Sequence, residues 1–313
     1  MKTILVTGSA GYIGSVVCKM AIEHGYKVIA VDIGEHKHNY HHVRMDKTCC
    51  SDPKVAMVAV DFKVDAIFHL AASANITDSL TRPLLYYQNN TGVTAKMMDN
   101  MIMAGWRGNV IFSSTAAAYK VSGEPVVEND PTGPINAYGR SKLMCEELLK
   151  EVYKAHQIPV VVFRYFNVAG AYEDVGDHLD SHHVVQRLCH SMTTKQPFYV
   201  CGTDYNTRDG TCVRDYLHVL DIAAAHFHAL NHHTEPCYEL YNLGTHQGTS
   251  VRELANKFTD VVGKQMPILD AVPRPGDQAF MVANPSKFMK TGFRYKHSSL
   301  DEMICSAWKH YRS

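Results

Sequence analysis

A tyrosine and a lysine stand four residues apart in the stretch NAYGRSK (136–142). In a helix, residues four apart lie one turn apart on the same face, so the hydroxyl of Tyr138 and the ammonium of Lys142 can meet. The pKa of a free tyrosine is about 10, and a nearby cation can lower it until the phenolate acts as a base at neutral pH. The same spacing also occurs by chance in ordinary helices. The surrounding sequence therefore has to decide between a proton-transfer pair and an exposed surface pair.

Hydroxyl side chains end the strand that precedes this pair. The stretch NVIFSST (109–115) is a nearly continuous apolar run that ends in Ser113, Ser114 and Thr115. Such a run is typical of a strand that is covered on both faces in a parallel sheet. Sheets of this kind bind ligands at the carboxyl ends of their strands. Thr115 is therefore a candidate to hold a substrate hydroxyl in line with the oxygen of Tyr138.

A glycine-rich turn lies between the first predicted strand and the first predicted helix, in the stretch TGSAGYIG (7–14). Gly8 allows a tight turn, Gly11 lets the backbone approach a pyrophosphate, and Gly14 lets the helix pack closely on the sheet. The N–H groups at the start of the helix then face the anion. Asp32 ends the second predicted strand, where a carboxylate binds both hydroxyls of an adenosine ribose and repels a 2′-phosphate. The pattern favours NAD over NADP, and Asp46, ending the third predicted strand, can reach the adenine amino group.

Strand and helix signals alternate through the first half of the chain. Strands are predicted at 2–7, 27–32, 42–46, 65–72, 109–115 and 160–167, and helices from the glycine turn to residue 22 and at 52–60, 83–104 and 138–156. This order predicts an α/β fold with a doubly wound, Rossmann-like parallel sheet. Polar loops at 168–182, 203–215 and 271–278 punctuate the remainder. We expect them to belong to a smaller C-terminal substrate-binding lobe over the carboxyl ends of the strands.

The composition argues against several classes of partner and cofactor. The 313 residues carry 31 Lys+Arg and 31 Asp+Glu, so no net basic field favours nucleic acid. No stretch approaches the roughly 18 apolar residues that cross a bilayer, and the apolar run of MKTILVTG is too short for a signal peptide. The 19 histidines and nine cysteines lack the spacing of metal ligands, so we expect no metal. Scattered cysteines without a framework indicate reduced thiols, and we expect a cytoplasmic protein without a membrane partner.

Longer stretches occur in one order between residues 7 and 277: TGSAGYIGS, FHLAA, PLLYYQNN, IFSSTAAAY, AYGRSKLMCE, RYFNVAGA, DGTCVRDYLHV, YNLG and PRPGD. Together they resemble the extended short-chain dehydrogenase/reductase family and, within it, the UDP-glucose (UDP-galactose) 4-epimerases. GTCVRDYLHV and RYFNVAGA are specific to that group, whereas the glycine loop and the Tyr-x-x-x-Lys spacing occur throughout the family. The predicted last helix, LDEMICSAWKH, extends the resemblance almost to the C-terminus.

The resemblance implies a role for each matching residue. Tyr138 is the base, Lys142 binds the nicotinamide ribose and lowers the pKa of the tyrosine, and Thr115 bonds the reacting sugar hydroxyl. The implied NAD contacts are Gly8, Gly11, Tyr12, Ile13, Gly14, Asp32, Ile33, Asp46, Lys47, Leu70, Ala71, Ala72, Asn89, Ser113, Tyr138, Lys142 and Phe166. The implied UDP-sugar contacts are Thr115, Tyr138, Asn167, His183, Val184, Tyr199, Val200, Cys201, Arg214, Arg274, Asp277 and Met281. Of these, the two arginines meet the diphosphate and Asp277 lies near the uridine ribose.

The reaction that the resemblance implies is epimerisation at C4 of a UDP-hexose. Tyr138 takes the proton of the 4-hydroxyl while C4 gives its hydride to NAD, the 4-keto sugar turns about its diphosphate link, and the hydride returns to the other face. The implied domains are an NAD-binding domain at 1–167, with returning segments near 214–243, and a nucleotide-sugar lobe at 168–213 and 244–313. Resembling enzymes often form homodimers, and the apolar helices predicted at 83–104 and 138–156 favour one here.

Other activities on the same scaffold stay open. A 4,6-dehydratase or a decarboxylase resembles this pattern, but in the dehydratase pattern an acid follows the active-site threonine, and here Ala116 and Ala117 follow Thr115. Epimerisation of a UDP-N-acetylhexosamine is an alternative, because Met281 is intermediate in bulk at the hexose pocket. Epimerisation of a UDP-pentose or a UDP-uronate is another alternative that the sequence does not exclude. A regulator that senses NAD(H) without turnover is a further alternative, although such proteins characteristically lose the tyrosine or the lysine.

Overall fold

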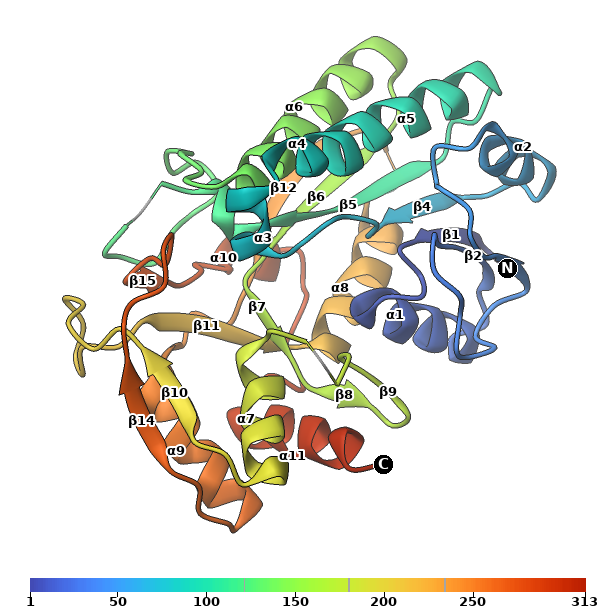
Figure 1. Cartoon of the computed structure of the whole chain (residues 1–313). Helices are drawn as coiled ribbons and strands as arrows, with labels where there is room; N and C mark the ends of the chain where they lie inside the picture. The colour runs from blue at the N-terminus through green and yellow to red at the C-terminus, as the bar shows by residue number, and fades with distance from the viewer. Residues whose placement is uncertain (121, 180, 234) are drawn as a thin grey trace. The chain divides into compact units, whose positions relative to one another are not determined.

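Six apolar segments of the first half form strands at nearly the positions that the sequence predicts (Figure 1). They are β1 (Thr3–Thr7), β2 (Lys27–Val31), β3 (Val43–Met45), β4 (Ala66–His69), β5 (Asn109–Thr115) and β6 (Val160–Tyr165). β1, β4 and β6 are buried along their whole length. Strands that are apolar at every position need cover on both faces, which a sheet between two helical layers provides.

These strands and β12 (Tyr238–Leu243) form one sheet in the order β12-β6-β5-β4-β1-β2-β3. β1 pairs in parallel with both β2 and β4, and the pairs β2–β3 and β4–β5 are parallel as well. The chain therefore winds outward from β1 in both directions, and the strand order reverses between β1 and β4. This is the topological switch point at which doubly wound sheets bind their ligands. The predicted fold class is confirmed.

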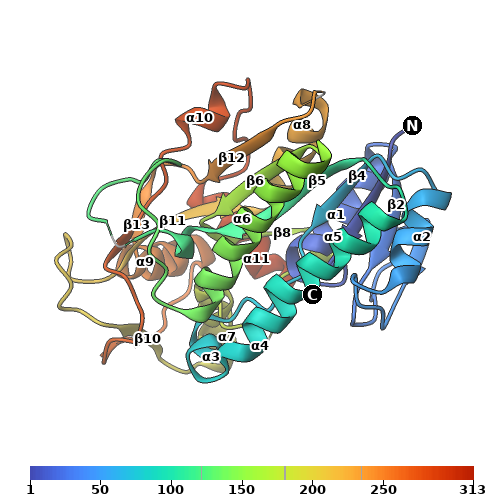
Figure 2. The same cartoon turned by 90° about the horizontal axis from the view of Figure 1, so that it is seen from above.

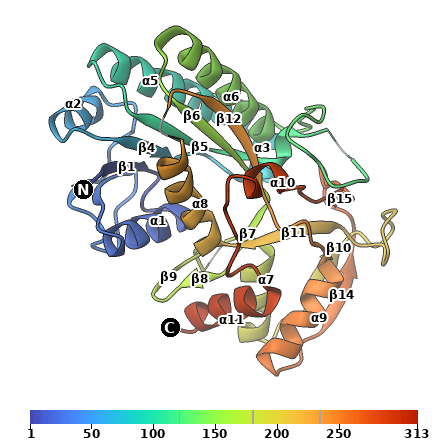
Figure 3. The same ribbon diagram turned by 180° about the vertical axis from the view of Figure 1, so that it is seen from behind.

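Helices cover both faces of this sheet. α2 (Pro53–Asp61), α5 (Val93–Met103) and α6 (Ala137–His156) lie on one face and α1 (Tyr12–Glu23) on the other, with α8 (Val219–His232) beside it from Ala223 onward (Figures 1 and 3). The short segments α3 (Ile76–Thr81), α4 (Pro83–Tyr86) and the 3₁₀ turn η2 (Ala116–Ala118) complete this part. Viewed from above, α5 and α6 run side by side (Figure 2).

The prediction of one continuous α-helix at 83–104 is wrong in its middle. Between α4 and α5 the helix widens to a π-helical segment, η1 (Tyr87–Gly92). The buried side chain of Asn90 lies there and donates to the carbonyl of Ser73 (3.0 Å) and the hydroxyl of Ser141 (2.9 Å). The sequence pattern carries no signal for the wider turn, because it depends on partners outside the helix.

The structure describes the whole chain except Val121, Asp180 and Thr234, of which Asp180 falls in the predicted loop at 168–182. The chain divides into two units. Unit 1 comprises Met1–Lys120, Thr132–Arg164 and Ala223–Tyr241, and unit 2 comprises Val121–Pro131, Tyr165–Ile222 and Asn242–Ser313. Among the described residues, no helix is both long and apolar enough to cross a membrane.

This division differs from the predicted domains at 121–131, 165–167 and 214–222, all of which belong to unit 2. Strand pairing explains the difference. β11 (Val213–His218) pairs with β7 (Asn167–Ala169), β13 (Gly248–Ser250) and β15 (Phe280–Met281), all strands of unit 2. Val126 likewise donates its backbone N–H to the carbonyl of Val282 (2.9 Å).

Unit 2 has further elements, several of which share a second core. They are the hairpin β8 (Ala171–Tyr172) and β9 (Val175–Gly176), the parallel pair β10 (Phe198–Cys201) and β14 (Ile268–Ala271), and the helices α7 (Val184–Thr194), α9 (Val251–Val262), α10 (Ser286–Met289) and α11 (Leu300–Tyr311). Leu188, Phe198, Phe258 and Ile304 come together in this core. α9 begins with a full capping box between Ser250 and Glu253.

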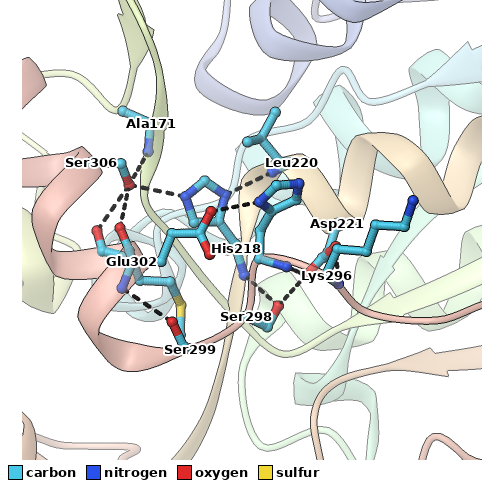
Figure 4. Close-up of polar contacts among 11 residues, drawn as sticks. Ala171, His218, Leu220, Asp221, Lys296, Ser298, Ser299, Glu302 and Ser306 are labelled. Atoms are coloured by element: carbon cyan, nitrogen blue, oxygen red, sulfur yellow. Dashed lines mark hydrogen bonds and ion pairs between the residues drawn. The ribbon is translucent and has the colours of Figure 1, made fainter.

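A buried histidine ties α11 to the strands of unit 2 (Figure 4). Nδ1 of His218 accepts the N–H of Leu220 (3.1 Å), so Nε2 carries the proton and donates to the hydroxyl of Ser306 (2.9 Å). Ser306 in turn accepts the N–H of Ala171 (3.2 Å) and donates to the carbonyl of Glu302 (2.8 Å). Both ring nitrogens of the neutral His218 ring have hydrogen-bond partners. Burial disfavours the charged ring and lowers the pKa of His218 to about 4.

This arrangement predicts acid sensitivity of the fold. An unfolded histidine takes up a proton near pH 6.5 and folded His218 only near pH 4, so stability is complete above pH 6.5 and is lost as the pH falls from 6.5 to 4. The loss from this group is about 3 kcal/mol. His218→Gln keeps a side-chain donor for Ser306 but does not titrate. We expect a flatter pH dependence of the free energy of unfolding by urea in this variant, and an unchanged dependence would contradict the assignment.

Candidate active site

The glycine loop of unit 1 is closed so tightly that side chains are excluded from it. Gly8 has a left-handed backbone (φ 69°), and a Cβ there would lie 2.7 Å from the backbone nitrogen of Ala71. A Cβ on Gly14 would lie less than 3.0 Å from the carbonyl oxygen of Gly8. Gly11 is the N-cap of α1 and supplies no side chain to its first turn. The first turn of α1, with Tyr12 and Ile13, is thus built to receive a phosphate, and these residues fit the pyrophosphate of NAD.

Asp32 lies beside this loop, directly after β2. Its carboxylate accepts the backbone N–H of Ala10 (2.9 Å) and of Gly34 (2.8 Å). These bonds hold the carboxylate between the glycine loop and the next turn, at the carboxyl end of β2. The position fits the ribose contact expected of Asp32, and its negative charge there disfavours a 2′-phosphate.

Asp46 is held by neighbours that the sequence analysis did not single out. Nδ1 of His36 donates to its carboxylate, and Nε of Arg44 lies 2.6 Å from it. The hydrogen bond from His36 and the charge of Arg44 keep the pKa of Asp46 below its usual value. Nε2 of His36 also bonds to the hydroxyl of Ser9 in the glycine loop (2.7 Å). Through His36, the carboxylate of Asp46 therefore holds the glycine loop in place. The contact of Asp46 with adenine stays a prediction.

The other cofactor candidates of unit 1 line the carboxyl ends of the neighbouring strands. The backbone N–H groups of Leu70 and Ala71, at the end of β4, donate to Thr7 (both 3.2 Å). Asn89 donates to the hydroxyl of Ser73 (3.1 Å), and Lys47 pairs with Glu35 (2.6 Å). Ser113 lies within β5, whereas Ile33 and Ala72 lie shortly after the ends of β2 and β4, and Ile33 is exposed.

Tyr138 and Thr115 are brought together by the close packing of α6 on the segment after β5. Asn136 caps α6 by accepting the N–H of Gly139 (2.8 Å). A Cβ on Gly139 would lie less than 3.0 Å from the carbonyl of Ala117, so only glycine lets the helix come this near. Burial raises the pKa of the Tyr138 phenol, while a hydrogen bond with Thr115 lowers it.

Lys142 lies one turn further along α6 and is 2% exposed. Its ammonium stands 4.4 Å above the ring of Phe112 in β5, a cation–π contact. Burial lowers the pKa of Lys142 to about 8. We predicted that Lys142 lowers the pKa of Tyr138. Burial acts in the opposite direction and outweighs the hydrogen bond with Thr115, so the effect of Lys142 stays a prediction. A phenol with a raised pKa is a proton donor unless further positive charge approaches it.

Two charged residues behind this site were also missed. Glu146, one turn beyond Lys142, forms a buried ion pair with Arg164 of β6. A signal was present in the sequence, because Arg164 is the one charge inside the apolar run VVVFRYF and a buried charge needs a partner. His69 is similar. Its ring bonds to the hydroxyls of Thr7 (2.7 Å) and Thr94 (2.9 Å), and burial lowers its pKa to about 3.

Apart from Thr115 and Tyr138, the candidates for binding a nucleotide sugar lie in unit 2. Arg214, in β11, is 3.7 Å from the carboxylate of Asp277 and pairs with Met281 across the strand pair β11–β15. Arg274 and Asp277 belong to one exposed turn, closed by the N–H of Asp277 on the carbonyl of Arg274 (3.2 Å). Arg214, Arg274, Asp277 and Met281, distant in sequence, are therefore carried by adjoining segments.

His183 is the N-cap of α7, and Val184 is the first residue of that helix. Nδ1 of His183 is 2.7 Å from the carboxylate of Asp177. Burial alone would lower the pKa of His183, but the hydrogen bond and the charge of Asp177 outweigh it and raise the pKa. The remaining candidates of unit 2 are Phe166, Asn167 in β7, and Tyr199, Val200 and Cys201 in β10. Among the residues that the structure describes, no three His, Cys, Asp or Glu side chains gather to hold a metal ion.

Comparison with known proteins gives a consistent result. Residues 4–244 match the family model described as "NAD dependent epimerase/dehydratase family". The chain is 38% identical to the UDP-glucose 4-epimerase of Azospirillum brasilense, over 99% of this chain and 92% of that protein. The structure is similar to that of a UDP-glucose 4-epimerase of Stenotrophomonas maltophila with bound NAD and formylated UDP-arabinopyranose, with a TM-score of 0.93, 31% identity and coverage of 100% and 98% of the two chains. It is also similar to the enzyme of Bifidobacterium longum in complex with NAD+ and UDP (TM-score 0.92, 31% identity, coverage 99% and 98%).

The closed glycine loop gives a test of the cofactor site. Gly14→Ala pushes a methyl group against the carbonyl of Gly8, which costs roughly 2 kcal/mol of packing strain. We expect a lower unfolding temperature and about ten-fold less NAD retained per chain, measured by absorbance after denaturation and filtration. Gly123→Ala is the matched control, because its Cβ meets nothing within 4 Å. Equal NAD retention in both variants would show that the loop does not bind the dinucleotide.

Proposed function

Because the chain belongs to the NAD dependent epimerase/dehydratase family, we propose that it inverts the configuration at C4 of a UDP-hexose and interconverts UDP-galactose and UDP-glucose. The observation that carries this assignment is the placement of Tyr138, Thr115 and Lys142 on two adjoining elements of unit 1, α6 and β5. The loop proposed to bind NAD follows β1, a strand of the same sheet as β5. Proton transfer and reversible oxidation at one carbon therefore have their groups in one unit.

Each of these side chains has a separate role in the reaction. The hydroxyl of Thr115 holds the 4-hydroxyl of the sugar beside Tyr138, which takes its proton as a base and later returns it as an acid. NAD, when bound, supplies the reversible two-electron oxidation at C4. Lys142 supplies the positive charge that favours the phenolate, against the burial that raises the pKa of Tyr138. Because the second half reverses the first, one tyrosine suffices for both proton transfers.

Elimination chemistry is disfavoured at this site. A 4,6-dehydratase needs an acid next to the active-site threonine, and the buried residue that follows Thr115 is Ala116, whose side chain transfers no proton. Ala116 and Ala117 instead form the turn η2 against which α6 packs. The sequence of this segment therefore serves close packing, which suits epimerisation.

Unit 2 binds the UDP moiety. Two guanidinium groups, Arg214 and Arg274, match the two charges of a diphosphate and can each give paired hydrogen bonds. Asp277 bonds to the uridine ribose. Met281 is buried and flexible, so it leaves the choice between a hexose, an N-acetylhexosamine, a pentose and a uronate to measurement.

The test is direct. Purified protein incubated with UDP-galactose, without added cofactor, is expected to form UDP-glucose, followed by proton NMR. Parallel reactions with UDP-N-acetylgalactosamine, UDP-arabinose and UDP-galacturonate determine the breadth of substrates. Folded protein that forms no product from any of them, even after NAD is added, would overturn the proposal and favour a cofactor-sensing role.

Tyr138→Phe is the control that ties turnover to the named base. Removing one oxygen leaves the packing of α6 unchanged, so NAD is retained, while the rate falls about 10³-fold or more through the loss of general base catalysis. Substantial activity in this variant would assign the base to another residue.

We also propose that the protein is a homodimer, formed through the exposed face of α4, α5 and α6. Leu84 (72% exposed), Met103 (80%) and Met144 (42%) present apolar side chains on these helices, which lie together in unit 1 (Figure 2). Such an exposed apolar surface is typical of a site of association. The nine cysteines are free thiols, which supports the reducing cytoplasm as the compartment.

Light scattering at micromolar concentration is expected to give the mass of two chains. Leu84→Asp combined with Met144→Asp introduces charges on this face and is expected to give monomers. Met57→Asp is the control, since Met57 is an exposed methionine (62%) on α2. A monomeric mass for the unaltered chain, or dissociation by Met57→Asp alone, would contradict this interface.

A further inference from the structure

One buried ion pair in unit 1 has no role in the reaction as described. Glu146 of α6 and Arg164 of β6 meet with side chains only 4% and 3% exposed. Nε and Nη2 of Arg164 donate to the two carboxylate oxygens of Glu146 (3.0 and 2.6 Å). The hydroxyl of Ser114 in β5 donates to the same carboxylate. The pair is therefore bidentate and joins three elements, β5, β6 and α6.

Stability alone is a poor reason for such a pair. Moving two charges out of water costs several kcal/mol for each ion, and buried ion pairs can often be replaced by apolar residues without loss of stability. Here both ions lie in the buried interior of unit 1. The position of the pair relative to the site is more informative.

Glu146 continues the face of α6 that carries the chemistry. Tyr138, Lys142 and Glu146 are spaced four residues apart, so they follow one another along one side of the helix. Thr115 bonds to Tyr138 and Ser114 bonds to Glu146, so two consecutive residues of β5 hold α6 on either side of Lys142. These two contacts fix the position of the helix along the strand.

Arg164 fixes the segment that follows Thr115. Its guanidinium lies 4.5 Å above the ring of Tyr119, which ends the turn η2. Ala117, in that turn, is the residue that the backbone of Gly139 approaches. Arg164 thus connects the carboxylate of Glu146 to the segment on which the contact between Thr115 and Tyr138 depends.

Glu146 also acts on the charge of Lys142. Burial lowers the pKa of Lys142 to about 8, and Cys145 and Glu146 oppose this change. Burial raises the pKa of the Cys145 thiol, so that group is uncharged at neutral pH, whereas the carboxylate of Glu146 forms an ion pair with Arg164. Without this carboxylate, one of the groups that oppose the effect of burial on Lys142 is lost, and the pKa of Lys142 falls further.

We propose that Glu146, clamped by Arg164 and Ser114, is a positioning residue that supplies the counter-charge one turn from Lys142 and holds Tyr138 opposite Thr115. This inference rests on the proposed function for its kinetic consequence, but its electrostatic part concerns Lys142 in the folded chain whatever the substrate. Neither Glu146 nor Arg164 contacts the reacting atoms; both act through α6 and β5.

Glu146→Gln tests the inference, because it keeps the shape and removes the charge. We expect kcat with UDP-galactose to fall roughly 10- to 100-fold, as for a misplaced catalytic group, while KM changes less than about two-fold because the UDP contacts lie in unit 2. Removing the carboxylate lowers the pKa of Lys142 further, so the alkaline limb of the kcat profile moves to lower pH. Glu151→Gln is the matched control on the same helix, since Glu151 is exposed and pairs with Lys154 (2.8 Å). It should change neither quantity.

A second measurement needs no turnover. Trace labelling of amines with acetic anhydride across a pH series, followed by mass spectrometry of the peptide that contains Lys142, reports the pH at which this amine loses its proton. The midpoint should fall in Glu146→Gln and stay unchanged in Ser114→Ala and Glu151→Gln. If it stays unchanged in Glu146→Gln, the inference fails even when the chain is an active epimerase. If it falls in a chain that turns over no UDP-sugar, only the proposed function fails.

Glu146→Gln alone leaves Arg164 buried without its counter-ion and can unfold the chain. The double variant Glu146→Gln/Arg164→Met removes both charges, so it is expected to fold, with an unfolding temperature close to that of the unaltered chain. The labelling midpoint of Lys142 should still be lowered. A stable double variant with an unshifted midpoint and full kcat would reduce the pair to a structural element and overturn the proposal.

Discussion

The burial of one ammonium group constrains the rest of unit 1. Lys142 is enclosed where burial lowers its pKa to about 8, and a desolvated cation is stable only if its surroundings compensate. The compensating groups are the face of Phe112, 4.4 Å away in β5, and the carboxylate of Glu146 on α6. The contact with Phe112 exists only while α6 lies directly on β5, and Ser114 of β5 holds the carboxylate of Glu146 in place. Because Gly139 has no side chain, α6 can approach this closely. The burial of the lysine therefore depends on this glycine.

Glycines also permit a close approach of two backbone segments at the cofactor loop. At Gly8 and Gly14, as at Gly139, a Cβ would lie less than 3.0 Å from backbone atoms of a neighbouring segment. In each case the backbone itself forms the surface of the site, and its N–H and C=O groups cannot change rotamer. Such positions give up conformational entropy, and in return the carboxylate of Asp32 and the phenol of Tyr138 are placed by rigid segments. Preorganised polar groups of this kind contribute most to transition-state stabilisation.

The sequence predicts the sheet and the glycine loop because their signals are local. Apolar runs, glycine spacing and an acid at the end of a strand can each be recognised without knowledge of the partner. What it misses depends on distant residues. The π-helical turn around Asn90 requires Ser73 and Ser141, the pair of Glu146 requires Arg164, and β11 joins unit 2 through strands near 167, 249 and 281. The raised pKa of Tyr138 is not apparent from the sequence either, because spacing along a helix says nothing about burial.

The division of the residues between the two units bears on how specificity can change. The groups proposed for proton transfer and the loop proposed to bind NAD lie in unit 1, where packing against Gly139 and the buried pair of Glu146 leaves little freedom. The candidates for UDP-sugar contact lie mostly in unit 2, on the exposed turn of Arg274, on β10 and at His183. Substitutions there act on binding, since the groups that bear on kcat are in the other unit. A chain of this design can therefore change its sugar while the chemistry at C4 stays the same, because elimination would require an acid beside Thr115, where this chain has Ala116 and Ala117.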